Sequence, residues 1–226
     1  MDSSNLGCKT DIGPGLSLYA KFPNEVDLIW YRDDDEKLKR DHFQDMERAK
    51  FDHLVSRIEN LFHVIELDAK VLVEQFADRV SNAKLSDNVN IIKSVQRVQL
   101  KIGTKYWTCK FRVLRKYAKR QVSAPIHFGF VLESQDGQLF ARSWIWVRGV
   151  QRSWVSDRIS RFSPRFRKLP PCPVWPKDES LMLANENVLT LLEADESASS
   201  IVQKAFLPIE LITPRSWAAL LDAPKI

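Results

Sequence analysis

Basic and aromatic residues alternate along the centre of this sequence of 226 residues, and their chemistry points to a polyanion as ligand. Lysine and arginine neutralise phosphate groups, and indole rings stack on unpaired bases for about 1–3 kcal/mol per base. Because these residues recur at every second position of two hairpin-like segments, they should share one face of a β-sheet. The candidate nucleic-acid-binding residues on that face are Lys101, Lys110, Arg112, Arg142, Trp144, Trp146 and Arg148. A basic and aromatic sheet face is typical of proteins that bind RNA or single strands.

The two tryptophans also permit a structural interpretation. Tryptophan is highly buried on average, so Trp144 and Trp146 could instead pack under a long helix, with the neighbouring arginines paired to acids of that helix. The sequence leaves open whether the two rings are exposed or buried.

A second basic segment follows the hairpins and adds to the candidate interface. Residues 142–168 hold eight Lys or Arg against the single acid Asp157. A loop of this charge can follow a phosphate backbone and become ordered on binding, whereas a solvated surface loop is the alternative. The further candidates are Arg115, Lys116, Arg152, Arg158, Arg161, Arg165, Arg167 and Lys168.

The charge of the whole chain is strongly polarised. The net charge is only +5, yet residues 88–177 hold 19 Lys or Arg against three acids, a net of +16, and the remaining residues carry a net of −11. Such a chain can present a positive face to a polyanion and stay soluble. The alternative is that the two parts neutralise each other within the fold.

His127 offers a catalytic alternative. With Tyr106, Lys110, Arg112 and Arg142 on nearby strands, it could cleave RNA without a metal, by general acid–base transfer and phosphate stabilisation. The sequence does not show that these residues converge, so a metal-independent ribonuclease remains the second alternative to non-catalytic binding.

Motifs for metal or nucleotide chemistry are not evident. The seven glycines form neither a dinucleotide fingerprint nor a P-loop, and the sequence contains no Cys-x-x-Cys and no His-x-x-x-His pair. The acids from Asp33 to Glu36 are better explained as a helix start. The tripeptide Asp68-Ala69-Lys70 has the local form of a nuclease motif, but the helical spacing around it opposes the strand that this motif needs. We therefore expect no metal and no cofactor.

Hydrophobic spacing predicts a long helical region before the sheet. No Gly or Pro occurs from Asn24 to Ile102, and apolar residues recur three or four positions apart between Phe43 and Ala83. One helix over 35–84 would be roughly 75 Å long at 1.5 Å per residue. We therefore expect a break around 65–69, and favour a helical hairpin over a projecting arm.

The spacing then changes to two, which predicts four successive antiparallel strands. Residues 98–102 and 107–113 alternate around a turn at Gly103, and residues 126–132 and 139–147 alternate around Asp136-Gly137, a strong hairpin signal. The rest of the prediction comprises short strands at 16–22, 26–31, 188–192 and 207–213, an irregular Pro-rich stretch at 149–178, and helices at 196–206 and 214–221.

These observations define an α+β protein. It comprises a lead-in with short strands (1–32), an acidic amphipathic region forming a long helix or helical hairpin (33–87), a basic four-stranded antiparallel meander (88–150), a basic Pro-rich loop (151–178) and a small acidic α/β C-terminal element (179–226). The expected function is non-catalytic binding of nucleic acid, single-stranded DNA or RNA, in a larger assembly. A scaffold protein that binds a protein partner through residues 35–84 is the first alternative. The sequence shows no membrane span and no signal peptide, so we expect a cytoplasmic protein with no membrane partner.

Overall fold

The computed structural model describes residues 12–24, 26, 48–85, 92–102, 106–115, 126–166, 169–172 and 180–222. Within these residues, five strands form one sheet in the order β1-β2-β3-β4-β5, and every neighbouring pair is antiparallel. The strands are β1 (Ile92–Ile102), β2 (Tyr106–Arg115), β3 (Ile126–Gln135), β4 (Gln138–Val147) and β5 (Leu181–Asn187). The α+β class and the four-stranded meander are therefore confirmed, and β5 extends the sheet by an edge strand that the sequence did not predict.

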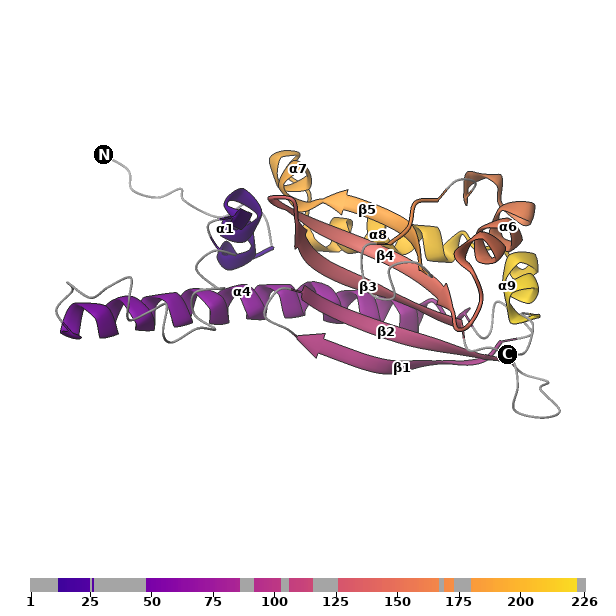
Figure 1. The fold of residues 1–226 in the computed structure, drawn as a ribbon, viewed down its shortest axis with the longest axis horizontal. Coiled ribbons are helices and arrows are strands. Elements are labelled where there is room, and N and C mark those ends of the chain that lie inside the picture. Colours follow the sequence, from indigo (N-terminus) through magenta and orange to yellow (C-terminus); the bar gives the residue numbers. More distant parts are fainter. Residues whose placement is uncertain are drawn as a thin grey trace.

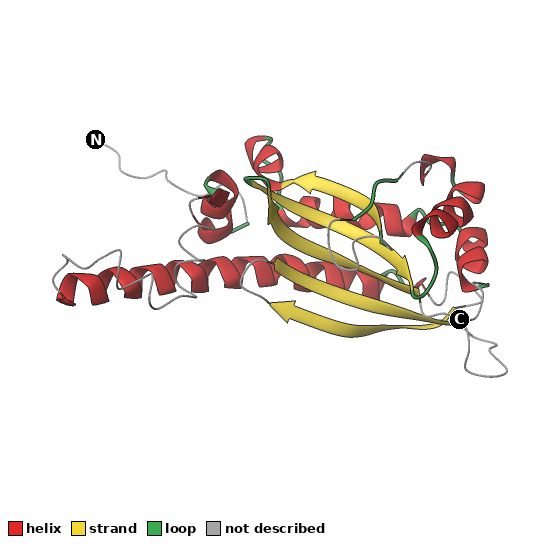
Figure 2. Cartoon of the chain, viewed as in Figure 1, coloured by secondary structure: helices red, strands yellow, loops and turns green. Residues whose placement is uncertain are grey.

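Helices cover one face of this sheet, and no helix of the described residues covers the other face (Figures 1 and 2). The long helix α4 (Arg48–Asn82) crosses β1, β2 and β3, and α8 (Ala198–Glu210) lies beside it over β4 and β5. The helix α1 (Pro14–Lys21) packs on α4, and α7 (Val188–Glu193) follows β5. The helices α6 (Arg152–Phe162) and α9 (Pro214–Leu221) and the 3-10 turn η1 (Pro164–Phe166) lie at the end of the sheet where β4 ends.

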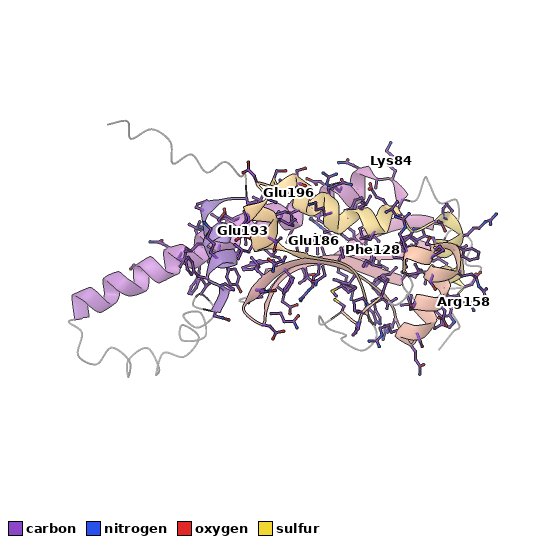
Figure 3. The ribbon with its side chains drawn as sticks, turned by 90° about the horizontal axis from the view of Figure 1, so that it is seen from above. Lys84, Phe128, Arg158, Glu186, Glu193 and Glu196 are labelled. Carbon is purple, nitrogen blue, oxygen red and sulfur yellow. The ribbon has the colours of Figure 1, made fainter. Side chains whose placement is uncertain are left out.

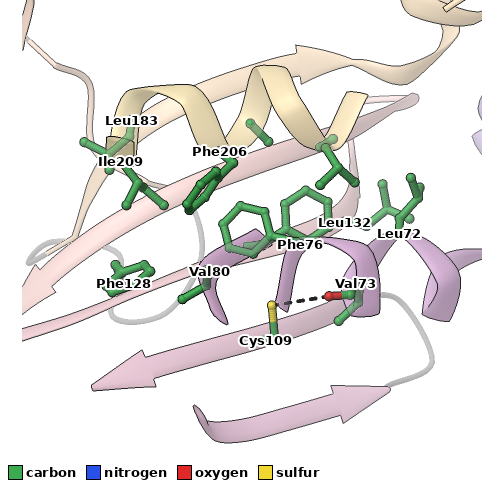
Figure 4. Close-up of a cluster of buried hydrophobic side chains, with 14 of the residues drawn as sticks. Leu72, Val73, Phe76, Val80, Cys109, Phe128, Leu132, Leu183, Phe206 and Ile209 are labelled. Carbon is green, nitrogen blue, oxygen red and sulfur yellow. Dashed lines mark hydrogen bonds between the residues drawn. The ribbon is translucent and has the colours of Figure 1, made fainter. Parts of the chain in front are cut away.

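Phe76 of α4 is central to the core between the helices and the sheet. Its ring stacks on Phe130 of β3, with 5.0 Å between centroids, and meets the edge of Phe206 of α8 at 5.5 Å. Figure 4 shows Phe76 and Phe206 among the surrounding aliphatic side chains, and Cys109 of β2, whose thiol donates to the carbonyl of Val73 at 3.8 Å. These contacts join α4, α8 and the sheet into one hydrophobic core.

α4 is a single unbroken helix over its 35 residues, so the predicted break and the helical hairpin are wrong. At 1.5 Å per residue it is about 52 Å long, and its first turns project beyond the sheet as an arm (Figure 1). The helix continues through 65–69 because Ile65 and Ala69 are fully buried at the helical spacing of four. The predicted helical residues 33–47 lie outside the described part of the chain.

Asp68, from the tripeptide that resembled a nuclease motif, holds α1 in place. Its Oδ2 accepts hydrogen bonds from the backbone N–H groups of Gly15 and Leu16, at 2.8 and 3.0 Å. A carboxylate at this position satisfies N–H groups that have no partner within the helix and interacts favourably with the helix dipole. Gly15 allows the close approach, because a Cβ there would lie 2.8 Å from the backbone nitrogen of Ile65.

Several short segments differ from the prediction. Residues 16–22 lie mostly in α1, 188–192 lie in α7 and 207–210 extend α8 through Pro208, so the strands predicted there are wrong. The strand predicted at 26–31 lies outside the described residues except for Val26. Short apolar runs fit a strand and a buried helix turn equally well, and tertiary packing decides between them. The helix at 196–206 and the final helix are confirmed, the latter capped by Thr213 Oγ1, which accepts from the N–H of Ser216 at 3.1 Å.

The basic stretch after β4 is also more ordered than predicted. It contains α6 and η1, so an irregular loop over 149–178 is wrong for residues 152–166. Only Val155 and Ile159 of α6 are buried. Two apolar residues four positions apart are too few to predict a helix from the sequence. The Ser216 hydroxyl of α9 donates to the carbonyl of Ile159 at 3.3 Å, which fixes α6 against α9.

Candidate anion-binding surface

The strand register gathers the predicted sheet residues on the face that α4 leaves uncovered. Lys110 of β2 pairs with Gly129 of β3, which pairs in turn with Trp144 of β4. In the same way Arg112 pairs with His127, which pairs with Trp146. The neighbouring residue on β2, Cys109, points the other way and contacts α4. The two tryptophans therefore do not lie under the long helix, which corrects that structural interpretation.

Both indole rings are nevertheless buried. Trp144 is 4% exposed and Trp146 is 8% exposed, and they pack with Val131, Cys172 and Met182 in a second, smaller apolar cluster. Gly129 makes room for the Trp144 ring, because a Cβ at Gly129 would lie 2.9 Å from that ring. Because a base can stack only on an accessible ring, the burial of Trp144 and Trp146 argues against a stacking role for them.

Arg142 is buried in a network of its own. Its side chain is 3% exposed, and it donates to Asn185 Oδ1 at 2.7 Å, to Glu133 Oε2 at 2.9 Å and to Gln135 Oε1 at 2.7 Å. Its guanidinium carbon also lies 4.4 Å from the centroid of the Phe140 ring. Burial lowers the pKa of Arg142, and the negative charge of Glu133 acts in the opposite direction. These contacts join β3, β4 and β5, so Arg142 has a structural role in the sheet.

Of the predicted sheet-face cations whose side chains the structure describes, Lys110, Arg112 and Arg148 remain, and they gather around His127. The imidazole of His127 stacks on Trp146 with 5.2 Å between centroids, and Lys110 Nζ lies 4.9 Å from the centroid of the same indole. Burial, followed by the positive charges of Arg112 and Arg148, lowers the pKa of Lys110. Burial, followed by Lys110 and Arg112, lowers the pKa of His127 to about 4. An anion placed among these groups would relieve their mutual repulsion.

The arginines of α6 and η1 continue this positive charge beyond the end of the sheet. Arg148 is exposed directly after β4, and α6 starts at Arg152. Arg158 is half-buried, with its guanidinium carbon 5.0 Å from the centroid of the Trp154 ring, and Arg161 and Arg165 are exposed. Figure 3 shows Arg158 toward the opposite end of the molecule from Glu193 and Glu196. The charge polarity of the sequence is thus a polarity in space for these residues.

A hollow of about 590 Å³ lies at the first turn of α6. It is lined by residues of that turn and by others from the segments before α6 and β5. The lining residues include Gly149, Gln151, Arg152, Ser153, Ser156 and Leu181. The Gln151 side chain does not cap the helix, and the backbone N–H of Trp154 donates to the carbonyl of Gln151 at 3.0 Å.

For the remaining predicted binding residues, the structure describes the backbone only, or the residue lies outside the described range. In the register, Lys101 of β1 pairs with Thr108 near the start of β2. Arg115, at the end of β2, pairs with Ile92 of β1. Lys116, Arg167 and Lys168 lie outside the described residues. His127 was predicted as a catalytic alternative and not as a binding residue, and the register places it between Arg112 and Trp146.

In the described residues, no group of three or more His, Cys, Asp or Glu side chains could hold a metal ion. No helix in the same part of the chain is both long and apolar enough to span a bilayer. Comparison with known proteins gives no match: no family model matches the sequence, and no curated protein or solved structure shows significant similarity to it.

Proposed function

We propose that this protein binds nucleic acid, single-stranded DNA or RNA, without catalysing a reaction. The interface is the basic surface formed by Lys110, Arg112 and Arg148 on the sheet and by Arg152, Arg158, Arg161 and Arg165 on α6 and η1. One observation carries the proposal: the strand register places Lys110 and Arg112 beside His127 and Trp146, with Lys110 Nζ 4.9 Å from the centroid of the indole. Burial, followed by the neighbouring positive charges, lowers the pKa of Lys110 and of His127. Such an arrangement is unfavourable alone and favourable beside an anion.

The surface suits contacts to the phosphate backbone better than base readout. The exposed groups are guanidinium and ammonium ions, which bind phosphates in any sequence context. The tryptophans that would have supplied base stacking are buried. We therefore expect affinity with little sequence preference and a strong dependence on salt, because each neutralised phosphate releases counterions.

Glutamates around β5 and α7 favour one orientation of the ligand. Glu186, Glu193 and Glu196 lie around β5 and α7, away from Arg158 (Figure 3). A polyanion would be repelled from that end and attracted to the α6 end, which favours one docking orientation and faster association.

A charge-reversal experiment tests the proposal. Arg112→Glu, Arg148→Glu and Arg161→Glu together should weaken the binding of a fluorescent 20-nucleotide strand by about 100-fold or more at low salt, because three attractive contacts become repulsive. The matched control reverses three exposed lysines elsewhere, Lys21, Lys70 and Lys84, with the same change in net charge. Equal loss in both variants would mean that only net charge matters and would contradict the proposed surface.

The scaffold alternative retains one supporting observation. Leu67 and Val71 lie one turn apart on α4 and are 49% and 48% exposed, although most of their apolar neighbours on this helix are buried. A protein partner on α4 would cover them. Sedimentation of the wild-type chain and of Leu67→Lys/Val71→Lys over a range of concentrations tests self-association through this face, and identical behaviour of the two would argue against it.

A further inference from the structure

His127 lies at a point where a ligand would complete an unfinished set of contacts. It is 5% exposed, stacked on Trp146, and its Nδ1 is a buried atom with no hydrogen-bond partner in the part of the chain that the structure describes. Buried polar atoms are nearly always hydrogen-bonded, so an unpaired one indicates a missing ion, water or ligand.

The groups around His127 specify the charge of that ligand. β2 contributes Lys110 and Arg112, and the end of β4 contributes Arg148; these are the charged groups that act on His127 from the strands on either side. The sequence from Asn88 to Leu132, which includes β2 and most of β3, contains no Asp or Glu. The charges that act on His127 are therefore positive, and they would favour an anion at this position.

Three cations around one buried imidazole suit a doubly charged anion better than a singly charged one. A phosphodiester carries one negative charge, whereas a phosphate monoester carries about −1.5 to −2 at pH 7 and presents three acceptor oxygens. Guanidinium groups bind phosphate oxygens in a bidentate manner, and ammonium groups bind them as point charges. A monoester could engage Arg112, Arg148 and Lys110 together and still leave an oxygen near His127.

We infer that Lys110, Arg112, Arg148 and His127 form a subsite for a phosphate monoester, namely the terminal phosphate of a nucleic-acid strand. This inference rests on the proposed function and adds to it that the protein prefers strand ends that carry a phosphate. Nδ1 of His127 is closed to solvent in this structure, so the phosphate reaches it only when neighbouring side chains move aside. His127 then acts as a hydrogen-bond partner for the phosphate, and Trp146 fixes the orientation of its ring. A bound dianion would oppose the effect of the three cations and raise the pKa of His127 from about 4.

The test compares 12-nucleotide single strands of one sequence that carry a 5′-phosphate, a 3′-phosphate or hydroxyls at both ends. At fixed salt, one of the phosphorylated strands should bind at least about tenfold more tightly than the hydroxyl strand, the size expected for an additional charge-assisted contact. A nucleoside monophosphate should compete with the phosphorylated strand and have little effect on the hydroxyl strand. Equal affinity for all three strands would overturn the inference and leave the proposed function intact. If no strand binds, the proposed function fails, and the inference fails with it.

Two further measurements isolate His127. His127→Phe keeps an aromatic ring beside Trp146 and removes the nitrogen, so it should abolish the preference for the phosphorylated strand and keep the affinity for the hydroxyl strand. The control Arg165→Glu should lower the affinity for the phosphorylated strand and for the hydroxyl strand by the same factor. If His127→Phe does not fold, NMR of the wild-type protein tests the inference instead. The resonance of the His127 ring should titrate at higher pH in the presence of a nucleoside monophosphate. An unchanged titration would overturn the inference.

Discussion

The imidazole of His127 and the indole of Trp146 stack face to face, with their planes 25° apart and their centroids at 5.2 Å. The pair lies on adjacent strands, on the sheet face without a helix, and Lys110 lies over the same indole. Because burial and three cations disfavour a further positive charge, His127 is neutral at pH 7.

Stability should fall as the pH falls from about 7 to 4, and His127 should account for part of the loss. The unfolded chain binds a proton at His127 near the ordinary pKa of 6.5, whereas the folded chain does so only at about 4. In that window the unfolded state binds more protons, so acid favours unfolding, by about 3 kcal/mol in total for this group. Urea unfolding at four pH values between 4.5 and 7.5 measures the effect.

His127→Phe should flatten this pH dependence, because the variant lacks the imidazole that takes up the proton. An identical pH slope in the wild type and in His127→Phe would show that His127 does not titrate as the structure indicates.

Loss of the Arg142 side chain should destabilise the fold strongly. Arg142→Ala removes the ion pair with the half-buried Glu133 and the hydrogen bonds to Gln135 and Asn185, at an expected cost of about 3 kcal/mol. Arg148→Ala, at an exposed site six residues later, should change the stability by no more than about 0.5 kcal/mol. Denaturation midpoints compare the two. A stable Arg142→Ala protein that has lost its affinity for nucleic acid would place Arg142 in the interface instead.

Removal of the Asp68 carboxylate should loosen α1. Asp68→Ala deprives the N–H groups of Gly15 and Leu16 of their acceptor, and the loss of such a cap costs about 1 kcal/mol. Asp78→Ala, at an exposed position of the same helix, is the control. Hydrogen exchange should accelerate in residues 14–21 of the first variant only. Unchanged exchange there would mean that packing alone holds α1.

RNA should remain intact during prolonged incubation with the pure protein in a chelator. Metal-independent cleavage needs both a proton acceptor and a proton donor at the scissile phosphate, and His127 is unprotonated at neutral pH. Gel analysis of a labelled strand is the measurement. Cleavage products that disappear with His127→Phe would instead establish the ribonuclease alternative.

The sheet could be predicted from the sequence because it depends on local signals. Alternation with period two and the Asp136-Gly137 turn defined β3 and β4, and the register then placed Lys110 and Arg112 beside His127. α6 and β5 gave weak signals, since α6 buries only two side chains and β5 ends in the polar sequence Asn185-Glu186-Asn187.

The roles of individual side chains on the sheet depended on contacts distant in sequence. In the sequence, Arg142 could not be distinguished from the other arginines. Its partner Asn185 lies on β5, 43 residues further along the chain. The burial of Trp144 likewise depends on Gly129 and Cys172, which lie on other segments. Alternation identified the face on which these residues lie, and only the three-dimensional structure separated the exposed cations from the buried ones.

The salt dependence of single-strand binding tests the central claim most directly. With several phosphates neutralised by Lys110, Arg112, Arg148 and the α6 arginines, the logarithm of the association constant should fall linearly with the logarithm of the salt concentration, with a slope of about −0.7 per phosphate. For this plot we expect a slope of roughly −3 for the wild type. The slope for Arg112→Glu/Arg148→Glu/Arg161→Glu should be clearly shallower. Binding that is indifferent to salt between low and physiological concentrations, or no binding at low salt, would contradict the account.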